Sequence, residues 1–62
     1  MEDDLFDVFR DEDPRLVWIG SVHSMDAARE LIRSKAVAAQ EKFVIYGVVT
    51  HTRVYLRAED CS

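Results

Sequence analysis

The sequence predicts an α+β fold, a four-stranded, mainly antiparallel sheet with one helix packed on one face and the order ββαββ along the chain. Two segments rich in β-branched and aromatic residues precede a single amphipathic segment, and two more follow it. A length of 62 residues allows one domain only. We assign residues 5–58 to that domain, residues 1–4 to a frayed acidic N-terminus and residues 59–62 to a polar C-terminal tail.

The first two strands are expected on either side of a charged turn. Residues 5–10 hold two phenylalanines and a valine, which favour a short strand. The turn over residues 11–14 ends in Pro14, whose nitrogen cannot donate to a sheet ladder and so belongs at the start of a strand. Residues 15–22 (RLVWIGSV) are β-branched and aromatic, and they predict the clearest strand of the chain.

The helix is predicted over residues 24–40. Ser24 can cap it, because its hydroxyl is placed to accept a hydrogen bond from an unpaired amide of the first turn. Asp26 in that turn faces the positive end of the helix dipole. Apolar residues recur at three- and four-residue spacing and form one stripe: Met25, Ala28, Leu31, Ile32, Ala36 and Ala39.

The last two strands are expected over residues 42–49 (KFVIYGVV) and 53–57 (RVYLR). Gly47, inside the third strand, indicates a bulge or a close approach of backbone. Residues 50–52 join the two strands without the glycine that such turns usually contain.

The second and third strands carry apolar side chains on both faces, whereas one helix can cover only one face. The uncovered face is expected to present Val17, Ile19, Val44, Tyr46, Val48 and Tyr55. Burying one such side chain contributes about 1.5–3 kcal/mol, so several together exceed the roughly 5 kcal/mol at the low end of small-domain stability. We therefore expect a homodimer that packs sheet on sheet through a two-fold contact. The alternative is a sheet that curls and encloses both faces within one chain.

The charge distribution and the single cysteine narrow the class of protein. The net charge is −4, with −6 over residues 1–13 and +2 over residues 14–62. Cys61 is the only cysteine, which excludes an internal disulfide and fits a reducing compartment. No apolar run is long enough to span a membrane, and the first residues are acidic where a signal peptide is basic and then apolar. A cytoplasmic protein without a membrane partner is the simplest expectation.

No motif predicts catalysis, a metal site or a cofactor. His23, His51 and Cys61 lack the paired spacing of zinc ligands. Ser21 lies near His23, but a nucleophile also needs an orienting acid and an oxyanion hole. The chain has two glycines and no GxSxG or phosphate-binding loop. We expect no catalytic, metal-binding or cofactor-binding residues, and a protein that is not an enzyme.

Three functions remain, and self-association is favoured among them. A second hypothesis is an adaptor or regulatory subunit, antitoxin-like, whose uncovered face binds a different protein. A third is weak binding of single-stranded nucleic acid by Arg53, Tyr55 and Arg57 on one face of the last strand. The acidic overall charge argues against nucleic acid, and charged residues also protect an edge strand from unwanted pairing.

The succession FxVFR, WIG, SMDAARELI, KFVIY and a final RVYL resembles short uncharacterised bacterial proteins with an aromatic strand, a tryptophan-bearing strand, a helix and a terminal hairpin. The likeness covers about residues 5–57. It implies the ββαββ fold and carries no activity or functional residue across. The sequence departs from the pattern at residues 50–52, where the final turn usually has a glycine.

Overall fold

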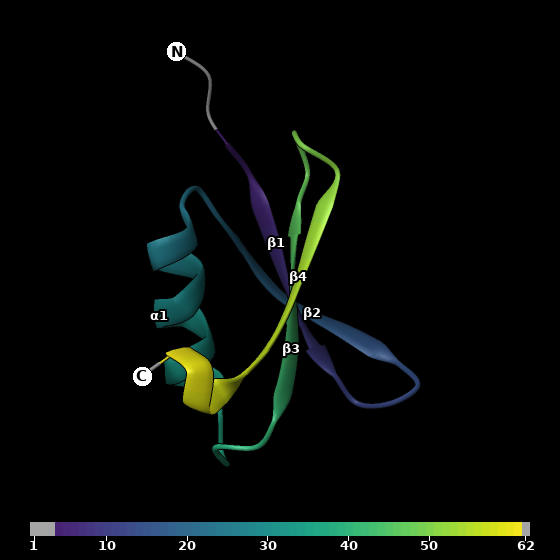
Figure 1. Ribbon diagram of the computed structural model, residues 1–62, viewed down its shortest axis with the longest axis vertical. Helices are drawn as coiled ribbons and strands as arrows, with labels where there is room; N and C mark the ends of the chain where they lie inside the picture. Colours follow the sequence, from purple (N-terminus) through teal and green to yellow (C-terminus); the bar gives the residue numbers. More distant parts are fainter. Residues whose placement is uncertain (1–3, 62) are drawn as a thin grey trace.

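A computed structural model describes residues 4–61 and confirms the predicted α+β fold. The elements are β1 (Phe6–Asp11), β2 (Leu16–Val22), α1 (Met25–Lys35), β3 (Lys42–Gly47), β4 (Thr52–Arg57) and the 3-10 helix η1 (Ala58–Cys61). The four strands form one antiparallel sheet in the order β2-β1-β3-β4. Because β2 and β3 both pair with β1, they run parallel to each other, and α1 crosses over β1 to join them. Figure 1 shows α1 and η1 on the same side of the sheet.

The β1–β2 hairpin contains a bulge that the sequence did not predict. The turn at its end lies where it was expected: a carboxylate oxygen of Asp11 accepts a hydrogen bond from the amide of Asp13 (3.0 Å). Farther along, Val8 pairs with Gly20, but the next residue, Phe9, pairs with Trp18. Ile19 is therefore an extra residue in β2. An extra residue reverses the inside–outside alternation of the strand beyond it.

The start of the helix is confirmed and its predicted end is wrong. The Ser24 hydroxyl accepts a hydrogen bond from the amide of Ala27 (3.0 Å), as an N-cap does. The helix stops at Lys35 instead of residue 40. The guanidinium of Arg10 donates to the Lys35 carbonyl (3.0 Å), which satisfies one of the last free carbonyls of the helix.

The segment after α1 leaves the helix because its carbonyls bind η1. The Ala39 carbonyl accepts from the amide of Glu59, and the Glu41 carbonyl accepts from the amide of Ala58, both at 2.9 Å. These bonds join residues that are distant in sequence, so the helical periodicity of the alanines could not reveal them. Tertiary hydrogen bonding outweighs helix propensity here.

The C-terminal residues form η1 and contribute to the core, in contrast to the predicted polar tail. Cys61 is 2% exposed and Ala58 is 7% exposed. The guanidinium of Arg33 on α1 donates to the Cys61 carbonyl and pairs with Glu30, which ties η1 to the helix. Of the two terminal predictions, residues 1–3 and 62 lie outside the described part of the chain.

The hydrophobic core lies between α1, η1 and one face of the sheet. Its buried members are Val8, Ala28, Ile32, Phe43, Ile45, Ala58 and Cys61. The helix sits close to β2 at Gly20, where an added Cβ would lie 2.9 Å from Leu31 Cδ2. At Gly47 an added Cβ would lie 2.7 Å from Thr50 Oγ1, which confirms the predicted close approach. The β3–β4 turn begins there, two residues earlier than expected, and His51 at its tip has a φ of 59°.

Candidate protein interface

The side of the sheet opposite α1 and η1, called the open face below, carries three rows of side chains. Neighbouring residues of a strand point to opposite faces, and Val8, Phe43 and Ile45 point into the core. The strand register then fixes what lies on the open face across β2, β1, β3 and β4. The middle row is Trp18, Phe9, Val44 and Tyr55; the row near the β1–β2 turn is Leu16, Asp11, Lys42 and Arg57; the row near the β3–β4 turn is Ser21, Asp7, Tyr46 and Arg53.

The middle row is apolar from one edge of the sheet to the other. Trp18 on one edge strand is 59% exposed, and Tyr55 on the other is 67% exposed. Between them Val44 is only 3% exposed, since its larger neighbours flank it. A hollow of about 320 Å³ opens beside it, lined by Phe9, Leu16, Val44, Tyr46, Arg53 and Tyr55.

Charges on the open face are divided between strands. The acids, Asp7 and Asp11, lie on β1, whereas the bases, Lys42, Arg53 and Arg57, lie on β3 and β4. Asp7 accepts a hydrogen bond from the Ser21 hydroxyl (2.5 Å), which holds the carboxylate over the sheet. One half of this face is thus acidic and the other half basic.

The predicted interface residues are only partly brought together. Val44, Tyr46 and Tyr55 lie side by side on the open face. The expected placement of Val17 and Ile19 there is wrong, because Val17 pairs with Arg10 on the helix-facing side and Ile19 packs against the core.

The bulge explains this error. Without it, simple alternation places Trp18 on the same side as Val22; with it, Leu16 and Trp18 move to the open face. Gly20 was the available signal, since a glycine inside a strand often marks a bulge. Val48, also predicted for the interface, lies in the turn after β3 and is half-buried.

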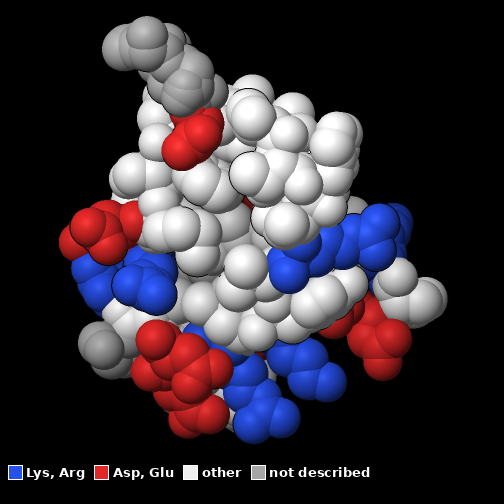
Figure 2. Space-filling model, turned by 45° about the horizontal axis from the view of Figure 1, so that its top comes forward, with Lys and Arg blue, Asp and Glu red and all other residues white. Residues whose placement is uncertain are grey.

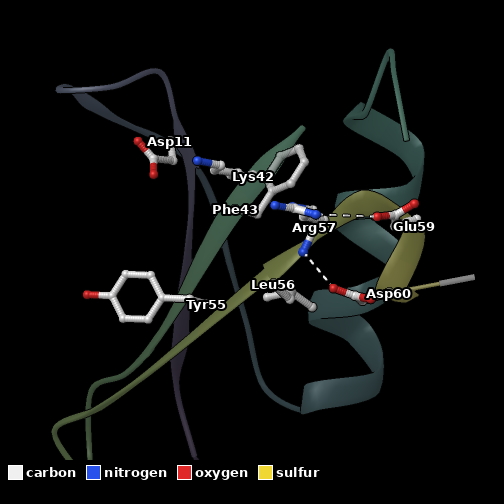
Figure 3. A pocket seen from close by; sticks show the side chains of 8 residues that line it. All are labelled: Asp11, Lys42, Phe43, Tyr55, Leu56, Arg57, Glu59 and Asp60. Atoms are coloured by element: carbon white, nitrogen blue, oxygen red, sulfur yellow. Dashed lines mark hydrogen bonds and ion pairs between the residues drawn. The ribbon is translucent and has the colours of Figure 1, made fainter. Parts of the chain in front are cut away.

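Figure 3 shows a charged depression at the end of the sheet near η1, with a volume of about 320 Å³. Arg57 lies between two acids of η1: its guanidinium is 3.8 Å from the Glu59 carboxylate, and its amide donates to Asp60 (3.0 Å). The Lys42 side chain points toward Asp11 on the other side (Figure 3). Both acids of η1 are thus engaged by the chain itself, and the depression combines three carboxylates with two cations without a nucleophile and base in contact.

The remaining candidate groups are spread over the molecule. His23 Nδ1 is 3.3 Å from the Asp4 carbonyl, and His51 Nδ1 is 3.1 Å from the Tyr46 hydroxyl. Burial raises the pKa of the Cys61 thiol, and the guanidinium of Arg29 offsets part of that rise. Within residues 4–61, no three His, Cys, Asp or Glu side chains come together as a metal site would require.

The described helices are too short or too polar to cross a membrane. Comparison with known proteins gives no match: no family model fits the chain, and no curated protein or solved structure is significantly similar to it. The fold implied by the resemblance to short bacterial ββαββ proteins is confirmed, and membership of such a group remains a prediction.

Proposed function

We propose that this chain is a small protein-interaction module that self-associates, with a second copy covering the open face. The observation that carries the proposal is the middle row, in which aromatic and aliphatic side chains span the whole sheet on the side without a helix. Side chains of this kind on a wet face lose the free energy that burial would provide, about 25 cal/mol per Å² of apolar surface.

The residue types on this face are those that dominate protein interfaces. Trp, Tyr and Arg are enriched among the residues that carry most of the binding energy. Trp18 and Tyr55 are large, exposed and fixed on strands, and Arg53 lines the hollow beside Tyr55. Rigid strands restrict these side chains before binding, which lowers the entropy lost on association.

Charge favours a second copy over an unrelated partner. The open face contains both an acidic half, on β1, and a basic half, on β3 and β4. A two-fold contact uses the same surface on both subunits, so that surface must complement itself. A face with both signs side by side meets this requirement, whereas a face of one sign repels its copy.

The area of the face sets the expected affinity. Four strands of about six residues give a flat area of roughly 400 Å² per copy, to which the relief of the side chains adds. Interfaces that bury less than about 1,200 Å² in total belong to weak complexes. We therefore expect a dissociation constant in the micromolar range, on the order of 10⁻⁶ to 10⁻⁵ M.

Sedimentation equilibrium over a dilution series tests the proposal, with Tyr55→Glu as the disrupting variant. Tyr55 is 67% exposed, so a glutamate there leaves the core intact while it places a charge in the middle of the interface. The matched control is Val37→Glu, because Val37 is 88% exposed and lies after α1, away from the open face. We expect the native chain and V37E to dimerise and Y55E to remain a monomer.

A native chain that is monomeric throughout the dilution series would contradict the proposal. So would equal association of Y55E and V37E, because the contact would then lie elsewhere. The adaptor hypothesis predicts a monomeric chain that forms a stoichiometric complex with a different protein. The nucleic-acid hypothesis predicts a monomeric chain that binds labelled single-stranded oligonucleotides at low salt and loses this binding in Arg53→Glu.

A further inference from the structure

We infer that the two-fold axis of the homodimer runs parallel to the strands and between β1 and β3, so that β1 of each copy lies over β3 of the other. This inference rests on the proposed function and specifies the geometry of the same contact. It follows from the strand order and from which residue lies where on the open face.

The geometry leaves few arrangements. When two copies of one sheet face pack against each other, their two-fold axis lies in the plane between them. Aligned packing keeps the strand directions within about 30°, so the axis runs either along the strands or across them. We call these the along-strand axis and the across-strand axis. A diagonal axis crosses the strands near 90° and brings only the centres of the two sheets together.

The along-strand axis exchanges left and right across the sheet and keeps each row over itself. The order β2-β1-β3-β4 then places β1 over β3 and β2 over β4 of the second copy. Asp11 lies over Lys42 of the second copy, and Trp18 lies over its Tyr55. The acidic half of each face meets the basic half of the other, and the apolar row meets the apolar row.

The across-strand axis keeps each strand over itself and exchanges the two outer rows. Asp11 then lies over Asp7 of the second copy, and Arg57 lies over its Arg53. Like charges meet on both halves of the face, and such contacts cost several kcal/mol when water is excluded. The charge distribution therefore excludes this axis.

The uncharged part of the surface favours the same choice. Figure 2 shows uncharged side chains gathered at the end that carries the β3–β4 turn, and acidic and basic side chains gathered toward the opposite end. The along-strand axis brings equivalent ends together, so the uncharged ends meet each other. It also places Trp18 of the second copy above Tyr55, at the rim of the 320 Å³ hollow.

Charge reversal in two separate chains tests the axis. Asp11→Lys places Lys over Lys in the along-strand dimer, and Lys42→Asp places Asp over Asp. Each variant alone should raise the dissociation constant at least about tenfold. When the two variants are mixed, lysine faces aspartate at both contacts, and a heterodimer of near-native affinity should form. The controls Asp26→Lys and Lys35→Asp make the same charge changes on α1 and should associate like the native chain.

The mixture is the decisive sample, because Asp11 and Lys42 are also cross-strand neighbours within one chain. A loss caused inside the chain persists in the mixture, whereas a loss caused between chains disappears. Recovery in the mixture supports the along-strand axis. A native dimer disrupted by Y55E, together with no recovery in the mixture, would overturn the axis and leave the proposed function standing. A native chain that never dimerises would overturn both.

Discussion

Replacing Trp18 with alanine is the substitution that separates association from folding most clearly. Trp18 lies at the edge of the sheet in the middle row of the open face and is 59% exposed in the single chain. Its removal therefore takes little from the interior. If a second copy covers the open face, most of that exposed surface is buried in the dimer.

The magnitude follows from the exposed fraction. A buried aromatic side chain removes about 150–250 Å² from water, and 59% of the upper figure is roughly 150 Å². At about 25 cal/mol per Å² this corresponds to roughly 3–4 kcal/mol per tryptophan. The dimer contains two such side chains, so we expect the dissociation constant of Trp18→Ala to rise at least about 100-fold. The unfolding free energy of the monomer should fall by less than about 1 kcal/mol, the span of strand propensity.

Two measurements on the same variant check these values. Sedimentation equilibrium gives the dissociation constant, and urea denaturation at concentrations below it gives the monomer stability. Val37→Ala is the matched control, since it also removes an exposed apolar side chain but lies away from the open face. An unchanged dissociation constant in W18A would refute the reasoning. A large loss of monomer stability would also refute it, because Trp18 would then pack within its own chain.

Three further predictions concern the fold. Ser24→Ala removes the acceptor for the amide of Ala27 and should lower the unfolding free energy by about 1 kcal/mol in urea denaturation. Gly47→Ala should destabilise by about 1–3 kcal/mol, because its Cβ would lie 2.7 Å from Thr50 Oγ1, and Thr50→Ala should restore part of the loss. Cys61, at 2% exposure, should react with a thiol reagent at least about tenfold more slowly in the native than in the unfolded chain. Because burial raises the pKa of its thiol, the stability that Cys61 contributes is complete below the unfolded-state pKa and is lost as the pH rises through the folded-state pKa.

Each of these predictions has a result that would count against it. An S24A chain as stable as the native one would mean that the first turn finds another acceptor. A G47A chain of native stability, or no gain from the second substitution, would show that the turn adjusts freely. Equal reaction rates of Cys61 in native and unfolded chains would place η1 away from α1.

Local patterns predicted most of the fold. The alternation and residue types of residues 15–22 and 42–49 identified two strands, and the Ser24 cap located the start of the helix. These features depend on neighbours within one turn or one strand, so a single sequence contains the information. The antiparallel sheet with a helix on one side followed from the order of the elements.

Long-range contacts account for what the sequence did not predict. The helix ends at Lys35 because the backbone beyond it binds η1, and η1 forms because Cys61 finds a buried place beside α1. Neither partner can be read from the residues near it. The same limit applied to the open face: one extra residue at Ile19 changed the side on which Leu16 and Trp18 lie. An apolar surplus was evident from composition, but its members depended on the register.

Accessibility of Trp18 as a function of concentration tests the central proposal most directly, because Trp18 is the only tryptophan and lies on the open face. A neutral fluorescence quencher is added to the native chain at concentrations above and below the expected micromolar dissociation constant. If a second copy covers the open face, quenching should be weak at high concentration and strong after dilution, with the emission moving to longer wavelength. Equal quenching at every concentration, with the chain sedimenting as a 7.2 kDa species, would contradict the proposal.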